Sequence, residues 1–89
     1  MARLINIGFG NVVNTDKILA VVNPDAAPVK RMVQNAKENG TVVDATQGRK
    51  TKAVLVTTAD ILILSALQPE TITKRFSNYD VEDKGDLDE

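Results

Sequence analysis

The sequence predicts a small α+β domain: a mainly antiparallel β-sheet with two helices, in the order β-β-α-β-β-β-α. The length of 89 residues allows a single domain. Short aliphatic runs bounded by turn residues are typical of strands, and two segments repeat apolar residues at the helical period. The apolar runs are far shorter than the ~20 residues of a transmembrane helix, and the first residues do not resemble a signal peptide. We therefore expect a cytoplasmic protein with no membrane partner.

The first two predicted strands are separated by a glycine-rich turn. The first strand covers residues 4–7 and ends at residues 8–11, where two glycines supply backbone angles that other residues resist. Val12 and Val13 resume the apolar pattern only briefly before a polar loop. The second strand, residues 18–22, is apolar at every position and ends before a proline.

A helix is predicted near residues 26–39. Pro28 suits its first turn, where the missing N–H costs nothing, and Gly40 is expected to end it as a left-handed cap. Its apolar stripe is spaced at i, i+3, i+4 and i+7 and consists of Val29, Met32, Val33 and Ala36.

Three more strands are predicted after this helix. The first runs from residue 41 to about residue 46, and residues 47–50 are read as a hairpin turn because of their glycine. Residues 53–57 form the returning strand. After another short turn, residues 61–64 form a further strand that is apolar at every position.

A second helix closes the predicted domain. It begins at Pro69, and Glu70 favours the N-terminal end of the helix dipole. Ile72 and Phe76 are four residues apart, so they lie on one helix face and form its buried edge.

The composition disfavours an enzyme. The chain has no Cys and no His, so it lacks thiolate chemistry, the commonest general base and the commonest metal ligand. The aspartates are scattered over turns and strand ends, as expected of turn residues. We expect no cofactor, no metal and no small-molecule substrate. A carboxylate enzyme would need two converging acids among Asp16, Asp44 and Asp60 in a deep pocket.

The net charge of −1 hides an asymmetry along the chain. Residues 1–78 carry ten Lys or Arg and six Asp or Glu, a net charge of +4, and are assigned to the single domain. Residues 79–89 carry one Lys and six acids, a net charge of −5, and are predicted to be a disordered acidic tail. The tail is interpreted as a solubilising end; a DNA mimic that competes for the basic body is the alternative.

The apolar strands predict self-association. Residues 54–56 and 61–64 do not alternate between apolar and polar side chains, so both of their faces need cover. Two short helices can cover only one face of a sheet of this size, so we expect the other face to be an interface between identical subunits. The alternative is a central strand that is buried within one subunit.

A basic cluster is the candidate binding site. Arg49, Lys50 and Lys52 fall within four residues, and Thr51 adds a hydroxyl donor for a phosphate oxygen. Lys50 and Lys52 would share one face of the strand, and Lys17 could reach the same surface. We expect no aromatic residue near the cluster for base stacking, which argues against binding single strands. The alternative is a solvated hairpin end without a ligand.

The sequence resembles the RemA family, the bacterial extracellular matrix regulatory protein A, over about residues 4–76. The blocks that carry the resemblance are Ile5-Asn6-Ile7-Gly8-Phe9-Gly10-Asn11, Ala27-Pro28-Val29-Lys30-Arg31-Met32, Asp44-Ala45-Thr46 with Gly48-Arg49, and Ile63-Leu64-Ser65-Ala66 with Gln68-Pro69-Glu70-Thr71. The resemblance implies a ring of identical subunits that binds DNA and activates operons for biofilm matrix and osmoprotection. It also implies DNA contacts at Lys17, Arg49 and Lys50. Two of these are Lys where the family pattern leads us to expect Arg, so the charge remains but forked contacts at 17 and 50 do not.

These inferences together predict an oligomeric, ring-shaped regulator of transcription that binds double-stranded DNA. Its contact residues would be Arg49, Lys50 and Lys17, assisted by Lys52 and Thr51. Repetition around the ring would raise a weak contact to a useful affinity. The alternative function is a structural or protein-binding ring that does not bind DNA.

Overall fold

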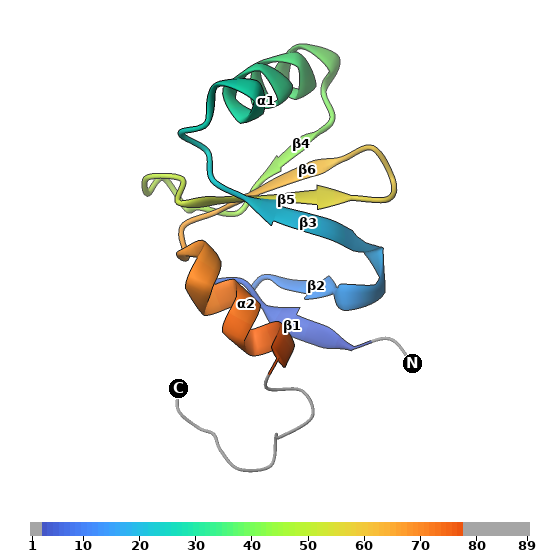
Figure 1. The fold of residues 1–89 in the computed structure, drawn as a ribbon, viewed down its shortest axis with the longest axis vertical. Helices are drawn as coiled ribbons and strands as arrows, with labels where there is room; N and C mark the ends of the chain where they lie inside the picture. The colour runs from blue at the N-terminus through green and yellow to red at the C-terminus, as the bar shows by residue number, and fades with distance from the viewer. Residues whose placement is uncertain (1–2, 78–89) are drawn as a thin grey trace.

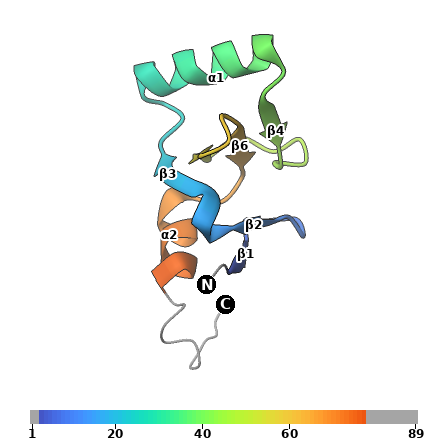
Figure 2. The same cartoon turned by 90° about the vertical axis from the view of Figure 1, so that its right-hand side faces the viewer.

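The computed structural model describes residues 3–77, which form three layers. Helix α1 covers one face of a four-stranded sheet, and a two-stranded hairpin together with helix α2 covers the other (Figures 1 and 2). In chain order the elements are β1 (Leu4–Asn6), β2 (Val12–Asn14), the 3-10 helix η1 (Thr15–Lys17), β3 (Ile18–Val22), α1 (Ala27–Asn39), β4 (Val42–Asp44), β5 (Ala53–Thr57), β6 (Leu62–Ser65) and α2 (Pro69–Ser77).

The predicted α+β class is confirmed, but the strands form two sheets rather than one. The larger sheet has the order β3-β5-β6-β4, and β1 pairs with β2 in a separate antiparallel hairpin. In the larger sheet β3–β5 and β5–β6 are antiparallel, whereas β4–β6 is parallel. The predicted order omitted β2, whose short apolar pattern becomes a strand because Val13 pairs with Ile5 of β1.

The predicted hairpin between β4 and β5 is wrong. Strand β6 lies between them, so their connection crosses the C-terminal end of β6 instead of folding β4 back onto β5. Residues 47–50 do include a tight turn, because the backbone N–H of Arg49 donates to the Thr46 carbonyl at 2.9 Å. Gln47 and Gly48 both have positive φ (55° and 79°), as the central residues of a type I′ turn do. The turn signal was therefore correct, but it did not specify which strands pair.

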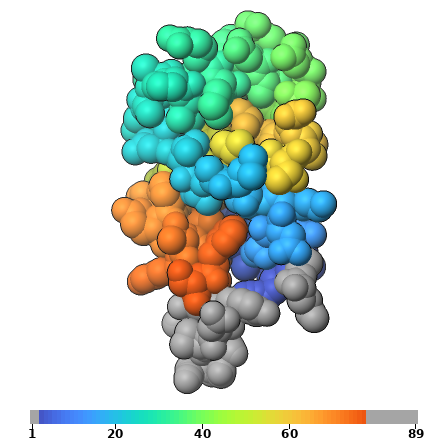
Figure 3. Space-filling view, turned by 45° about the vertical axis from the view of Figure 1, so that its right-hand side comes forward, coloured from blue at the N-terminus to red at the C-terminus, as the bar shows by residue number. Residues whose placement is uncertain are grey.

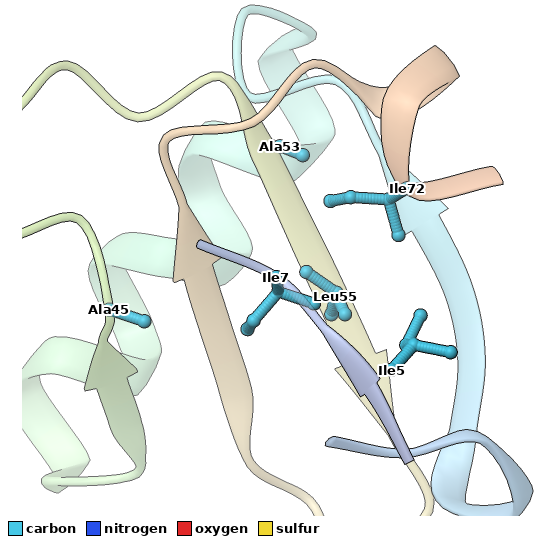
Figure 4. Packing of buried hydrophobic residues seen from close by; sticks show 6 residues of the cluster. All are labelled: Ile5, Ile7, Ala45, Ala53, Leu55 and Ile72. Carbon is cyan, nitrogen blue, oxygen red and sulfur yellow. The ribbon is translucent and has the colours of Figure 1, made fainter. Parts of the chain in front are cut away.

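The expectation that the helices cover only one face of the apolar strands is also wrong. Ala53 and Leu55 of β5 face Ile7 and Ile72, beneath the hairpin and α2 (Figure 4). Val54 faces the other way, into a second cluster beneath α1. All three β5 residues are fully buried, so the central strand is covered within one subunit, which was the alternative interpretation.

Helix α1 spans nearly the predicted residues, and α2 begins at Pro69 as predicted. Pro28 lies in the first turn of α1, and Gly40 caps its end in the left-handed conformation, with φ 73° and its N–H donated to the carbonyls of Ala36 and Lys37. Ile72 of α2 is fully buried, and Phe76 packs against the same cluster. Helix α2 lies beside β3 on the surface (Figure 3), where the two elements border a hollow of about 360 Å³.

The predicted acidic tail, residues 79–89, lies outside the described residues. Within residues 3–77, no helix is long and apolar enough to span a membrane.

Candidate nucleic-acid interface

The basic loop, residues 46–52, lies across the C-terminal end of the buried strand β6. The backbone N–H of Ala45, which precedes the loop, donates to the Leu64 carbonyl at 2.9 Å. At the other end of the loop, the backbone N–H of Lys52 donates to the Ser65 carbonyl at 2.8 Å. Both ends of the loop are therefore held by one strand of the sheet.

The entry to the basic loop is held by Asp44. One carboxylate oxygen of Asp44 accepts hydrogen bonds from the Thr46 hydroxyl at 2.6 Å and the Thr46 backbone N–H at 2.9 Å. These two bonds, the hydroxyl bond first, hold the pKa of Asp44 below its usual value, with a smaller contribution from the charge of Lys37. The aspartate thus acts as a turn residue, as the sequence indicates.

The structure brings Arg49, Lys50 and Lys52 together. All three side chains are exposed and Thr51 is half-buried. The prediction that Lys50 and Lys52 share a strand face is wrong, because β5 begins only at Ala53. Both lysines instead line two hollows beside the loop, of about 370 Å³ and 240 Å³. The larger hollow is lined by Phe9, Arg49, Lys50, Lys52, Ala66 and Leu67.

Lys17 lies at the other end of the sheet. It ends η1, and its carbonyl accepts the backbone N–H of Thr58 at 2.9 Å, next to the turn between β5 and β6. The five residues of β5 separate that turn from the basic loop, a span of roughly 17 Å at ~3.4 Å per residue. Within one subunit, Lys17 therefore does not reach the surface that carries Arg49 and Lys50.

An aromatic residue that the sequence analysis did not connect with the site lies beside the basic loop. The Arg49 guanidinium lies over the ring of Phe9, 5.7 Å from its centroid. The expectation that no aromatic residue adjoins the cationic cluster is therefore wrong. An aromatic residue between Gly8 and Gly10 was a signal for an exposed ring on a turn, but it did not show which loop the ring would meet.

The remaining cations have separate locations. Lys30 and Arg31 are exposed on α1. Arg75 of α2 donates to the Asn6 carbonyl at 2.8 Å, so it ties α2 to the hairpin.

The three aspartates considered for carboxylate chemistry do not converge on the hollows described above. None of the three hollows is lined by Asp16, Asp44 or Asp60. Residues 3–77 contain no group of three or more acidic residues placed to hold a metal ion.

Comparison with known proteins identifies the family. The chain matches the family described as "RemA-like: Extracellular matrix regulatory protein A-like" over residues 4–76. A protein of Acetivibrio thermocellus is 49% identical, with 98% of this chain and 99% of that protein covered. A protein of Thermosipho africanus is 53% identical, with 97% of this chain and 94% of that protein covered. A protein of Fervidobacterium nodosum is 55% identical, with 92% of this chain and 88% of that protein covered. All three bear the name "Putative regulatory protein", which implies a regulatory rather than a catalytic role. The residues that suggested RemA and the match along nearly the whole domain agree, and the chain belongs to the RemA-like family.

Proposed function

We propose that this regulatory protein binds double-stranded DNA as a ring of identical subunits and controls transcription. Arg49, Lys50 and Lys52 contact phosphates, and the Thr51 hydroxyl donates to a phosphate oxygen. The observation that carries this proposal is the basic loop itself, in which three exposed cations sit on a loop anchored at both ends to a buried strand. Such an arrangement presents charge to a polyanion without needing to order a flexible segment first.

The charge on one subunit is too small for tight binding. Each phosphate contact contributes a salt slope of only about −0.9, and non-specific affinities are weak. Linked copies of the same contact act at high effective concentration and gain affinity without new interactions. The proposal therefore requires an oligomer.

The edges of the larger sheet support such an assembly. Among the described residues, β3 and β4 are the two edge strands, on opposite sides of the sheet. Each exposes a large apolar residue: Leu19 of β3 is 67% exposed and Val43 of β4 is 51% exposed. Leu19 falls where the pairing register between β3 and β5 shifts, and such irregularities redirect a side chain outward. Pairing one edge with the opposite edge of the next subunit is a head-to-tail contact, which closes into a ring when the rotation allows it.

Lys17 makes a second contact in this proposal. Because it lies at the other end of β5 from the basic loop, it would touch a different stretch of DNA from Arg49 and Lys50 of the same subunit. A duplex bent around the assembly offers such separate stretches, and easily bent sequences would then be preferred.

The regulated genes are proposed from the family. Its description names extracellular matrix regulation, so we propose that the protein activates biofilm matrix and related operons in the cytoplasm of a bacterium. Chromatin immunoprecipitation of the protein from its host would test this target class.

A matched pair of double variants tests DNA binding. Arg49→Ala with Lys50→Ala removes one Arg and one Lys from the basic loop, and Lys30→Ala with Arg31→Ala removes the same charges from α1. We expect the first pair to abolish the shift of a duplex in a gel and the second pair to retain it.

For the parent, affinity for the duplex should fall steeply between a lower and a higher salt concentration. Native mass spectrometry should give the same oligomer for all three proteins. If both pairs bind the duplex as the parent does, the basic loop is not the contact surface; if the parent does not bind at all, a scaffold without DNA binding is the better interpretation.

A further inference from the structure

The exposed ring of Phe9 is placed differently from the large exposed apolar side chains of the four-stranded sheet. Leu19 and Val43 lie on the edges of the larger sheet, whereas Phe9 lies on a turn beside three cations. Phe9 is 48% exposed and has a positive φ of 55°, a conformation that bulky residues avoid. The surrounding turn must therefore hold it there.

Hydrogen bonds hold this turn closed. The Ile7 N–H donates to the Asn11 carbonyl at 2.8 Å, and the Gly8 carbonyl accepts from both the backbone N–H and the side-chain amide of Asn11, each at 3.0 Å. The Gly8 N–H donates in turn to the side chain of Asn6 at 2.7 Å. Gly8 and Gly10 have φ of 113° and 78°, so the turn needs glycine on both sides of the ring.

The Phe9 turn and the basic loop share one anchor, Ser65 at the end of β6. The Ser65 hydroxyl donates to the Ile7 carbonyl at 2.8 Å, and the Ser65 carbonyl accepts the Lys52 N–H at 2.8 Å. The Leu67 side chain packs beneath the Phe9 turn: a Cβ added at Gly8 would lie 3.5 Å from the Cγ of Leu67. The fold therefore fixes the distance between two loops that are about forty residues apart in the sequence.

We infer that Phe9 is a positioning residue for DNA binding: its ring holds the Arg49 guanidinium in the orientation from which it contacts a phosphate. The inference rests on the proposed function. Among the contacts of the described residues, the Arg49 guanidinium meets the Phe9 ring. A cation–π contact at this distance uses no hydrogen-bond acceptor, so the N–H groups of the guanidinium remain available for a forked contact with a phosphate. An arginine held in this way loses less side-chain entropy when it binds.

Phe9→Leu tests the inference, with Phe9→Tyr as the conservative control. Affinity for a duplex should fall at least twofold in Phe9→Leu and be restored in Phe9→Tyr. The salt slope should stay that of the parent, because no cation has been removed. Arg49→Lys, which keeps the charge but not the planar group, should lose affinity to a similar extent. In an Arg49→Ala background, Phe9→Leu should have no further effect, since the group that the ring positions is gone.

The outcomes separate this inference from the proposed function. If Arg49→Ala weakens binding and Phe9→Leu does not, Phe9 has no positioning role and the proposed function stands. If neither change weakens binding, the basic loop is not the DNA contact and both fail. If Phe9→Leu costs the same factor with and without Arg49, the ring acts on DNA or on the fold directly, which overturns the inference. Melting temperature and oligomer mass are measured on each variant, and Arg49→Lys, which leaves the Phe9 turn intact, decides the question if Phe9→Leu does not fold.

Discussion

Replacing Ser65 by alanine should destabilise the protein because it removes a buried hydroxyl with two partners. Ser65 is 0% exposed; its hydroxyl donates to the Ile7 carbonyl at 2.8 Å and accepts the Leu67 N–H at 3.1 Å. The Leu67 N–H is only partly buried, so water can replace its partner, but the Ile7 carbonyl loses the Ser65 hydroxyl in a buried position. A buried group left unsatisfied costs ~1–3 kcal/mol, so we expect the free energy of unfolding to fall by about 2 kcal/mol.

Urea unfolding measures this loss. For a small domain with a urea slope of ~1–2 kcal/mol per M, the midpoint should fall by about 1–2 M. The melting temperature should fall by roughly 8–16 °C, at ~4–8 °C per kcal/mol. Parent and variant must be compared at the same protein concentration, because assembly adds apparent stability by mass action.

Ser77→Ala provides the control, because Ser77 is exposed at the end of α2. Its effect should stay within ~0.5 kcal/mol. If Ser65→Ala is equally mild, the buried hydroxyl does not hold the Phe9 turn against β6. If the hydroxyl does hold the turn, Ser65→Ala should also weaken DNA binding at temperatures where the variant is still folded.

Two further predictions concern acid stability and assembly. Because the hydrogen bonds from Thr46 lower the pKa of Asp44 in the folded state, their stabilisation is complete above the unfolded pKa and is lost as pH falls through the folded value. The stability gap between the parent and Asp44→Asn should therefore narrow as urea unfolding is repeated from pH 6 down to pH 3, and a gap independent of pH contradicts this role. Leu19→Asp should reduce the oligomer to smaller species in native mass spectrometry while the circular dichroism stays unchanged, whereas Asn35→Asp, which adds the same charge on the exposed face of α1, should not. An intact oligomer in Leu19→Asp would remove β3 from the interface.

Local signals predicted the elements because each depends on neighbouring residues. Pro28 and Gly40 specify the ends of α1 through backbone angles that few other residues adopt. Strand pairing depends on contacts between distant segments, so the same reasoning failed there. The turn at Gln47 and Gly48 has the backbone of a hairpin turn, yet β6 takes the position beside β4, with Asp44 opposite Leu64.

The candidate site was predictable only as far as it is contiguous in sequence. Arg49, Lys50 and Lys52 lie together because they share one loop. Phe9 is forty positions earlier, and only the packing of both loops on the end of β6 brings its ring to Arg49. Lys17 was expected near the basic cluster, but the fold places it at the opposite end of β5.

In the proposed function, assembly and DNA contact use different surfaces of the sheet. The large exposed apolar residues of the four-stranded sheet lie on its edge strands, Leu19 on β3 and Val43 on β4, while the cations of the basic loop lie at the end of β6. The basic loop is attached to β6, which has a strand on each side of it and whose residues are buried or half-buried, so its geometry does not depend on a neighbouring subunit. The number of linked contacts, and so the avidity, then depends on the edge strands, whereas each single DNA contact depends on the basic loop. Variants of the two surfaces should therefore separate: Leu19→Asp should weaken DNA binding by removing multiplicity and leave each subunit's contact intact, whereas Arg49→Ala with Lys50→Ala should remove the contact from an intact assembly.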